Sequence, residues 1–357
     1  MPMTPSAVRC PGAVLLPPGL GLCVLLAFAG PEPAAAQGGL PSATEIVSFP
    51  SSDLTLGGVL YKPEGDGPFP AFLFNHGSAP GRLNDQAFEA VGPLFRGRGW
   101  VLFAPYRRGQ GLSAAAGPFV GDVIAGAQRT NARRVLPLVA LASVLALAGL
   151  VLATRRRRRW LRVVSVAVLV VASSGVAYAS HVRAGAAALV TALETDHLDD
   201  HLAALDWLRA QPFVDPDRIA TGGNSFGGVV TVLGAERVPY CAAVDAAGGA
   251  ESWRVAPGLR ARMTRAVQHA RAPVFFFQAA NDYDLAPSRS LAEAMASAGL
   301  PHQVKVYPPF GESAAAGHSF AWRGSAVWID DVVHFLDDHC MAGLASGTPR
   351  EPVLAAP

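Results

Sequence analysis

Short apolar runs alternate with longer amphipathic segments over most of the chain. Segments 45–49 and 54–61 alternate in polarity like the two strands of a hairpin. Later apolar runs have the length of buried strands, at 71–75, 100–104, 218–222, 242–244, 274–278 and 303–307. The segments between them have the apolar spacing of helices, at 85–96, 198–210, 227–234, 288–298 and 326–338. This alternation predicts an α/β fold, with a mostly parallel sheet and helices on both faces.

Two uncharged apolar stretches, 135–153 and 163–180, interrupt this pattern. Each has about 18 residues or more, which is long enough to cross the hydrocarbon core of a bilayer. Six arginines lie between them, within 155–162. The positive-inside rule keeps such a loop on the cytoplasmic side. We expect a transmembrane hairpin inserted at 133–183; a buried helical pair is the alternative.

The amino terminus carries a third apolar stretch, with Arg9 before it and the triplet Ala34-Ala35-Ala36 after it. This order predicts a secretory signal peptide, residues 1–36, with an uncleaved anchor as the alternative. Both membrane signals place the α/β domain, 37–132 and 184–345, outside the cytoplasm, in the periplasm or outside the cell. We expect residues 346–357 to be a disordered tail.

Composition agrees with this division of the chain. The sequence is 51% hydrophobic and only 16% charged, with a mean hydropathy of +0.29, and the apolar excess lies in the three stretches above. Its 29 basic and 27 acidic residues give no basic excess of the kind seen in nucleic-acid-binding proteins. Outside the signal peptide the only cysteines are Cys241 and Cys340. A disulfide could persist in an exported domain, but the spacing leaves their pairing open.

A candidate nucleophile follows the strand predicted at 218–222. The sequence Gly223-Asn224-Ser225-Phe226-Gly227 has the G-x-S-x-G pattern between a strand and a helix. A nucleophile elbow holds its serine in a strained turn with no room for neighbouring side chains, which explains the glycines. We therefore expect Ser225 to be the nucleophile.

A second turn, His76-Gly77-Ser78, follows the strand predicted at 71–75. Such a turn can aim a backbone amide at the oxyanion that forms when an acyl carbonyl is attacked. We assign the two amide donors to Ser78 and to Phe226, the residue after the nucleophile. The side chain of His76 is interpreted as structural.

The candidate acid and base follow later strands. Asp282 and Asp284 come after the strand at 274–278, and the spacing favours Asp282. His318 follows the last strand, beyond a loop of small residues at 313–316. Ser225, Asp282 and His318 have the chain order expected of this arrangement, in which the histidine takes the serine proton and the carboxylate orients the histidine.

Two further histidines, His197 and His201, are four residues apart among aspartates. A metal site is conceivable there, but a solvated helix face is the preferred interpretation because no third ligand is evident. No cofactor or metal is expected, since the chemistry above requires none.

With these motifs the sequence resembles the α/β-hydrolases, and within them the dienelactone hydrolase-like and prolyl oligopeptidase-like group. The resemblance is carried by 75–78, 104–111, 204–208, 223–228, 281–282 and 317–318. Dienelactone hydrolases use a cysteine nucleophile where this chain has Ser225, and prolyl oligopeptidases carry a propeller domain for which these residues leave no room. The resemblance therefore implies a serine hydrolase acting on carboxylic esters. The alternatives are a prolyl oligopeptidase-like peptidase and a non-catalytic membrane scaffold.

The hairpin follows the strand at 100–104. Connections that leave the carboxyl ends of parallel strands lie on the active-site face, so we expect the insert beside the catalytic mouth. This position suits a small-molecule or lipidic ester substrate recruited at a membrane, with a simple tether as the alternative. The sequence leaves the oligomeric state open.

Overall fold

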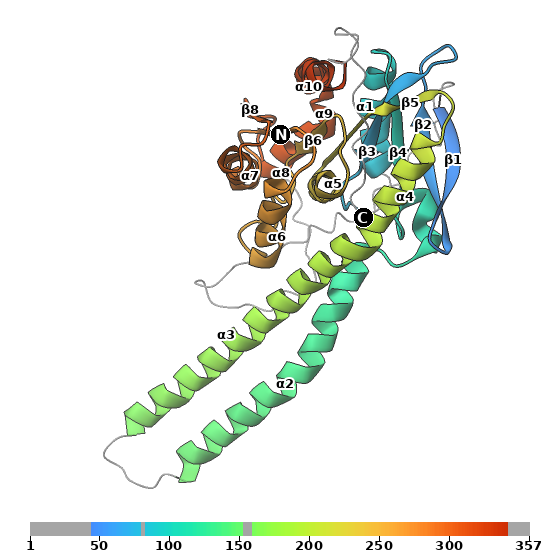
Figure 1. Ribbon diagram of the computed structural model, residues 1–357. Coiled ribbons are helices and arrows are strands. Elements are labelled where there is room, and N and C mark those ends of the chain that lie inside the picture. The colour runs from blue at the N-terminus through green and yellow to red at the C-terminus, as the bar shows by residue number, and fades with distance from the viewer. Residues whose placement is uncertain (1–43, 80–82, 153–158, 342–357) are drawn as a thin grey trace, which may run out of the picture. The chain divides into compact units, whose positions relative to one another are not determined.

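The computed structural model describes residues 44–79, 83–152 and 159–341. The predicted signal peptide, the tail and most of the arginine loop lie outside the described residues. Eight strands form one sheet in the order β1-β2-β4-β3-β5-β6-β7-β8 (Figure 1). The strands are β1 (Thr44–Ser51), β2 (Leu54–Tyr61), β3 (Phe69–Asn75), β4 (Val101–Pro105), β5 (Val214–Asn224), β6 (Ala243–Ala246), β7 (Val274–Ala279) and β8 (His302–Tyr307).

All neighbouring strands from β4 to β8 are parallel, and β1 and β2 are antiparallel additions at one edge. The helices are α1 (Leu83–Arg96), α2 (Val120–Leu152), α3 (Arg159–Ala192), α4 (Leu198–Arg209), α5 (Phe226–Arg237), α6 (Pro257–Gln268), α7 (Ala286–Ser297), α8 (Ala314–His318), α9 (Phe320–Arg323) and α10 (Ser325–Cys340). The predicted α/β architecture is confirmed.

Two apolar cores cover the two faces of the sheet. Helices α4, α5, α6 and α7 pack on one face, and α1, α9 and α10 pack on the other. The strand order reverses between β3 and β5, because the chain adds β4 on one side of β3 and β5 on the other. In open α/β sheets, ligands bind outside the carboxyl ends of the strands at such a switch point.

A disulfide joins Cys241, two residues before β6, to Cys340 at the end of α10, with the Cα atoms 4.9 Å apart. The pairing that the sequence left open is therefore present in the structure.

Helices α2 and α3 pack along each other as a hairpin (Figure 1). Both are long and apolar enough to cross a membrane, judged by length and composition alone. The most apolar stretch of each helix contains no buried residue. The alternative of a buried helical pair is therefore wrong. The hairpin is also longer than expected: α2 begins at Val120 rather than near residue 133, and its first part is polar. There the Ser180 hydroxyl donates to the Asn131 side chain at 2.9 Å.

Helix α3 continues into α4 through a single π-helical turn, η3 (Leu193–His197). This turn belongs to the domain, because Leu193 and His197 are buried. Glu194 pairs with Arg262 of α6. The second helix of the hairpin is therefore anchored directly in the domain core.

Candidate active site

Ser225 occupies a strained turn between β5 and α5. Its backbone angles are φ 55° and ψ −118°, a region that side-chain-bearing residues rarely adopt. The Ser225 amide donates to the Ala246 carbonyl at 2.9 Å, which fixes the turn to the end of β6. Ser225 is partly exposed, whereas Asn224 and Phe226 on either side are buried. The turn thus presents the hydroxyl of Ser225 at the end of the sheet.

The two glycines of the pattern are required by one neighbour. A Cβ atom on Gly223 or on Gly227 would overlap the carbonyl oxygen of Asn75, the last residue of β3. The strand end of β3 and the first turn of α5 therefore approach each other closely around Ser225. This packing explains the G-x-S-x-G spacing.

His318 and Asp282 form a hydrogen-bonded pair. His318 Nδ1 lies 2.8 Å from Asp282 Oδ1, and the Asp282 side chain is fully buried. Asp282 also accepts from Gln278 Nε2 at 3.0 Å and from the Tyr283 amide at 2.7 Å. Because Nδ1 faces the carboxylate, Nε2 is the ring nitrogen left for a nucleophile.

The protonation of His318 reflects opposing effects. Burial lowers its pKa, but the hydrogen bond to Asp282 and the negative charges of Asp282 and Glu251 outweigh it, so the pKa is raised above its usual value. The prediction of a loop before His318 is wrong, because His318 ends the short helix α8. The first turn of α8 is capped by the Ser313 hydroxyl, which accepts from the Ala316 amide at 3.1 Å. Its alanines form a helical turn because Ser313 satisfies one of the free amides.

Asp284, the other carboxylate that the sequence left open, has different partners. Its Oδ1 accepts from the Ala286 amide at 3.0 Å, and its Oδ2 lies 3.3 Å from Arg254 Nε. Asp284 thus caps α7, and Asp282 is the carboxylate in contact with His318.

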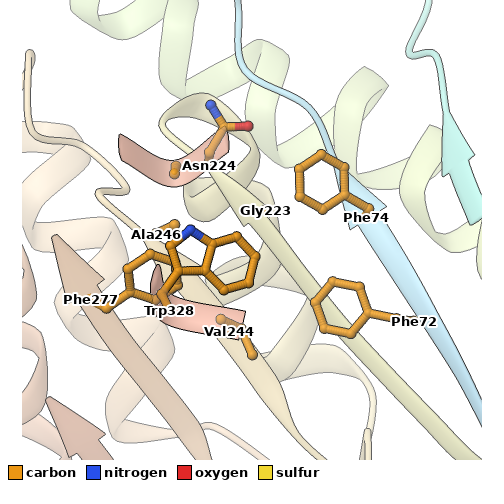
Figure 2. A pocket seen from close by; sticks show the side chains of 9 residues that line it. Phe72, Phe74, Gly223, Asn224, Val244, Ala246, Phe277 and Trp328 are labelled. Carbon is orange, nitrogen blue, oxygen red and sulfur yellow. The ribbon is translucent and has the colours of Figure 1, made fainter. Parts of the chain in front are cut away.

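Ser225 and His318 lie at the same end of the sheet, beyond the carboxyl ends of the parallel strands. β5, β6 and β7 are parallel neighbours whose carboxyl ends are in register through Asn224, Ala246 and Phe277. A small apolar cavity lies directly beneath this end (Figure 2), and its lining includes Asn224 together with Ala321 and Trp328 from the segment after His318. Among the described residues no hydrogen bond joins Ser225 to His318. The structure joins His318 to Asp282 and places Ser225 at the same carboxyl end of the parallel strands.

The two amides assigned to the oxyanion follow β3 and β5. A Cβ atom on Gly77 would lie 3.1 Å from the Asn224 side chain, so the turn that carries Ser78 rests against the residue before Ser225. Phe226 is the first residue of α5, and the first amides of a helix have no acceptor within the helix. Both amides are therefore in the neighbourhood of Ser225.

His76 has the structural place predicted for its side chain. It is fully buried, and burial together with the charge of Arg107 lowers its pKa well below the usual value. Its Nε2 accepts from the Arg107 amide at 3.2 Å. The neutral ring therefore carries its proton on Nδ1, 2.7 Å from the Gly77 carbonyl.

The prediction of a solvated face for His197 and His201 is wrong, because both are buried. The ring nitrogens of His201 lie 2.9 Å from Asn75 Oδ1 and 2.7 Å from the Tyr240 hydroxyl. His197 packs edge-on against the Phe226 ring, with centroids 5.2 Å apart. Both histidines thus support the turns around Ser225, and periodicity did not indicate this because their contacts are far away in sequence.

Comparison with known proteins agrees with the fold. Residues 176–334 match the dienelactone hydrolase family, and this range contains Ser225, Asp282 and His318. Over these residues the chain is similar to the dienelactone hydrolase family, and its fold is that of the α/β-hydrolases. The match begins inside α3, so strands β1 to β4, the turn that carries Ser78, and helix α2 lie outside it. No curated protein matches the chain.

Solved structures similar to this hydrolase include several peptidases. The acylaminoacyl peptidase of Pyrococcus horikoshii is similar with a TM-score of 0.50 and 14% identity, over 84% of this chain and 42% of that chain. A puromycin-hydrolyzing peptidase of Mycobacterium tuberculosis is similar with a TM-score of 0.51 and 17% identity, over 83% of this chain and 39% of that chain. Dipeptidyl peptidase 4 of Porphyromonas gingivalis is similar with a TM-score of 0.50 and 16% identity, over 83% of this chain and 35% of that chain. The hydrolase spans less than half the length of each, and at these identities the likeness is one of fold.

Proposed function

We propose that this α/β-hydrolase cleaves carboxylic esters through an acyl-enzyme on Ser225. The observation that carries the proposal is the hydrogen-bonded pair of Asp282 and His318 at the carboxyl end of the parallel strands, where Ser225 occupies its strained turn. A serine, a histidine and a carboxylate in these places are the parts of a nucleophilic triad.

In the proposed reaction, Ser225 Oγ attacks the ester carbonyl while His318 Nε2 takes its proton. The amides of Ser78 and Phe226 stabilise the negative charge on the carbonyl oxygen. His318 then gives the proton to the leaving alcohol, and the acyl group stays on Ser225. Water, deprotonated by His318, releases the acid and restores the serine. Asp282 keeps the imidazole oriented and stabilises its charged form.

Labelling with a fluorophosphonate probe tests this proposal. We expect the full-length protein in detergent to be labelled and to hydrolyse p-nitrophenyl esters, and Ser225→Ala to do neither. Ser297→Ala is the control, because the exposed Ser297 hydroxyl at the end of α7 donates only to the Glu293 carbonyl of the same helix, at 2.8 Å. A folded wild-type protein that is neither labelled nor active would overturn the proposal and leave the non-catalytic scaffold.

The same assay separates the ester hydrolase from a peptidase. The peptidase structures above are similar in fold, which makes aminoacyl anilides the appropriate second substrate panel. Hydrolysis of p-nitrophenyl esters without hydrolysis of the anilides supports the esterase. Preferential cleavage of the anilides would overturn the ester assignment while retaining the roles of the three residues.

We propose further that the hydrolase is exported and tethered to the cell membrane by α2 and α3. Large apolar side chains point outward along both helices; Leu138, Leu145 and Val171 are each more than 60% exposed, which is costly in water. The disulfide between Cys241 and Cys340 suits an oxidising compartment outside the cytoplasm. The arginine loop would then lie on the cytoplasmic side.

Fractionation tests the tether. Wild-type protein should stay with membranes after carbonate extraction, whereas a variant lacking residues 135–180 should be released. Release of the wild-type protein would contradict the proposal.

The position of the hairpin bears on the substrate. Its second helix runs through η3 to His197, which contacts Phe226, so the hairpin root adjoins the proposed oxyanion site. The polar first part of α2, about 15 residues or roughly 22 Å of helix, precedes the apolar span. Comparing dispersed esters with esters in vesicles decides between recruitment and tethering: selective loss of vesicle activity on deleting 135–180 supports a lipidic substrate, and equal activities support a small soluble one.

A further inference from the structure

Arg107 is an arginine buried without a carboxylate partner of its own. It follows β4 and is only 3% exposed, and no ion pair to Arg107 is present among the described residues. Its guanidinium instead donates to the carbonyls of His76 and Gly77, at 2.7 and 2.9 Å, and to Gln110 Oε1 at 3.2 Å. Burial lowers its pKa to about 9, so it is a cation at neutral pH. Burying such a charge is costly, and its location beside the nucleophile turn suggests a function.

We propose that Arg107 is the positioning residue for both amides of the oxyanion site; the inference rests on the proposed function of Ser225. The first half of the argument concerns the peptide unit between Gly77 and Ser78. In a trans peptide the carbonyl and the amide hydrogen point in opposite directions. The Gly77 carbonyl is held by two donors, Arg107 Nη2 and His76 Nδ1. The Ser78 amide is therefore directed away from Arg107.

The other side of this turn faces the nucleophile strand. Gly77 rests against Asn224, the residue before Ser225. With its carbonyl fixed on the Arg107 side, the peptide unit directs its amide hydrogen to the opposite side, where the described residues offer it no hydrogen-bond acceptor. A donor that is held in place before the reaction stabilises a developing negative charge without reorganisation.

The second half of the argument concerns Phe226. The Cζ atom of Arg107 lies 4.6 Å from the centroid of the Phe226 ring, a cation–π contact. Phe226 carries the other proposed amide donor. One guanidinium therefore contacts both segments that carry the two amides, although β3 and β5 contribute them from positions about 150 residues apart.

The neighbouring arginine is arranged quite differently. Arg108 binds Asp200 at 2.7 Å and Asp196 at 3.0 Å. The ordinary way to satisfy a buried arginine is thus available one residue away, and Arg107 has backbone carbonyls instead. This contrast distinguishes orientation of the turn from simple charge pairing.

Arg107→Lys tests the inference, because lysine keeps a cation but lacks the planar fork that holds two carbonyls. We expect kcat for a p-nitrophenyl ester to fall about 30-fold or more, since loss of a single oxyanion donor costs about 10²–10³. KM should stay within about 3-fold, and the rate of fluorophosphonate inactivation should fall in parallel with kcat. Arg262→Lys is the control: Arg262 is also buried, at 6% exposed, but pairs with Glu194 and Glu236, so kcat of this variant should change less than about 3-fold.

Gln110→Ala keeps the inference testable if Arg107→Lys does not fold. It leaves the cation in place and removes one of its acceptors, so kcat should fall about 3- to 10-fold at constant KM. Unchanged kcat in every folded variant, or a change confined to KM, would overturn the inference while the activity of the wild-type protein upholds the proposed function. A wild-type protein without hydrolysis would overturn both.

Discussion

The carboxylates of two neighbouring aspartates at the end of β7 have different partners. Asp282 binds His318 and Gln278 in the interior, whereas Asp284 caps α7 and pairs with an exposed arginine. Side-chain chemistry is identical in the two, so their roles are set by position.

This difference predicts unequal effects of the same substitution. Asp282→Asn should lower kcat by about 10³–10⁴, because an amide no longer holds the histidine in the required tautomer. Asp284→Asn, the matched control, should lower kcat less than about 3-fold, since asparagine caps a helix about as well as aspartate and only the ion pair with the exposed Arg254 is lost. Kinetics on a p-nitrophenyl ester measure both, and equal losses would contradict the assignment of Asp282.

The raised pKa of His318 predicts the acid limb of the pH profile. The base must be neutral to accept the serine proton, so kcat/KM should fall as the pH decreases through a value above the usual histidine pKa of about 6.5. Removing the negative charge in Glu251→Gln should move this limb to lower pH with little change in the plateau. A limb that does not move in this variant would show that Glu251 does not act on His318.

Residues of the site differ in how far sequence could reveal them. Ser225, Asp282 and His318 each follow a strand and have the expected order, so pattern alone was sufficient to nominate them. Arg107 and His201 act through contacts with the Asn75–Gly77 segment, 31 and 126 positions away. Nothing local marks such residues, because their partners become neighbours only in the folded sheet.

The close approach of β3 and α5 is the tightest packing among the elements of the site. It predicts that Gly227→Ala destabilises the fold by about 3 kcal/mol, since the added methyl group meets backbone that cannot move aside. Gly258→Ala in α6 is the control: its Cβ would enter open space, and alanine should add up to about 1 kcal/mol of helix stability. Thermal or urea unfolding measures both, and a neutral Gly227→Ala would contradict the packing described.

Most elements were predictable from periodicity, and those that were not have physical reasons. Helix α6 was missed because Arg262 occupies one of its buried positions, where two glutamates satisfy the charge. The turn α8 read as a loop because its alanines have no apolar period. Helices α2 and α3 were predicted too short because hydropathy marks the apolar spans and not the polar helix that continues from them.

For the molecule as a whole, the disulfide closes a segment of the chain that contains Asp282 and His318 but not Ser225. We predict that Cys340→Ser lowers the free energy of unfolding by about 2–4 kcal/mol. Reductant should destabilise the wild-type protein to the same extent and leave the variant unchanged. Wild-type unfolding that is indifferent to reductant would contradict the pairing.

Strand order also has a consequence for how the protein is made. β3 pairs with β5 at the centre of the sheet, yet both long helices are synthesised between them. The first four strands must therefore wait, with the apolar edge of β3 open, until the hairpin has been made and β5 follows it. If α2 and α3 enter a membrane as proposed, insertion precedes completion of the sheet, and the hydrolase gains its nucleophile turn only after it is already anchored.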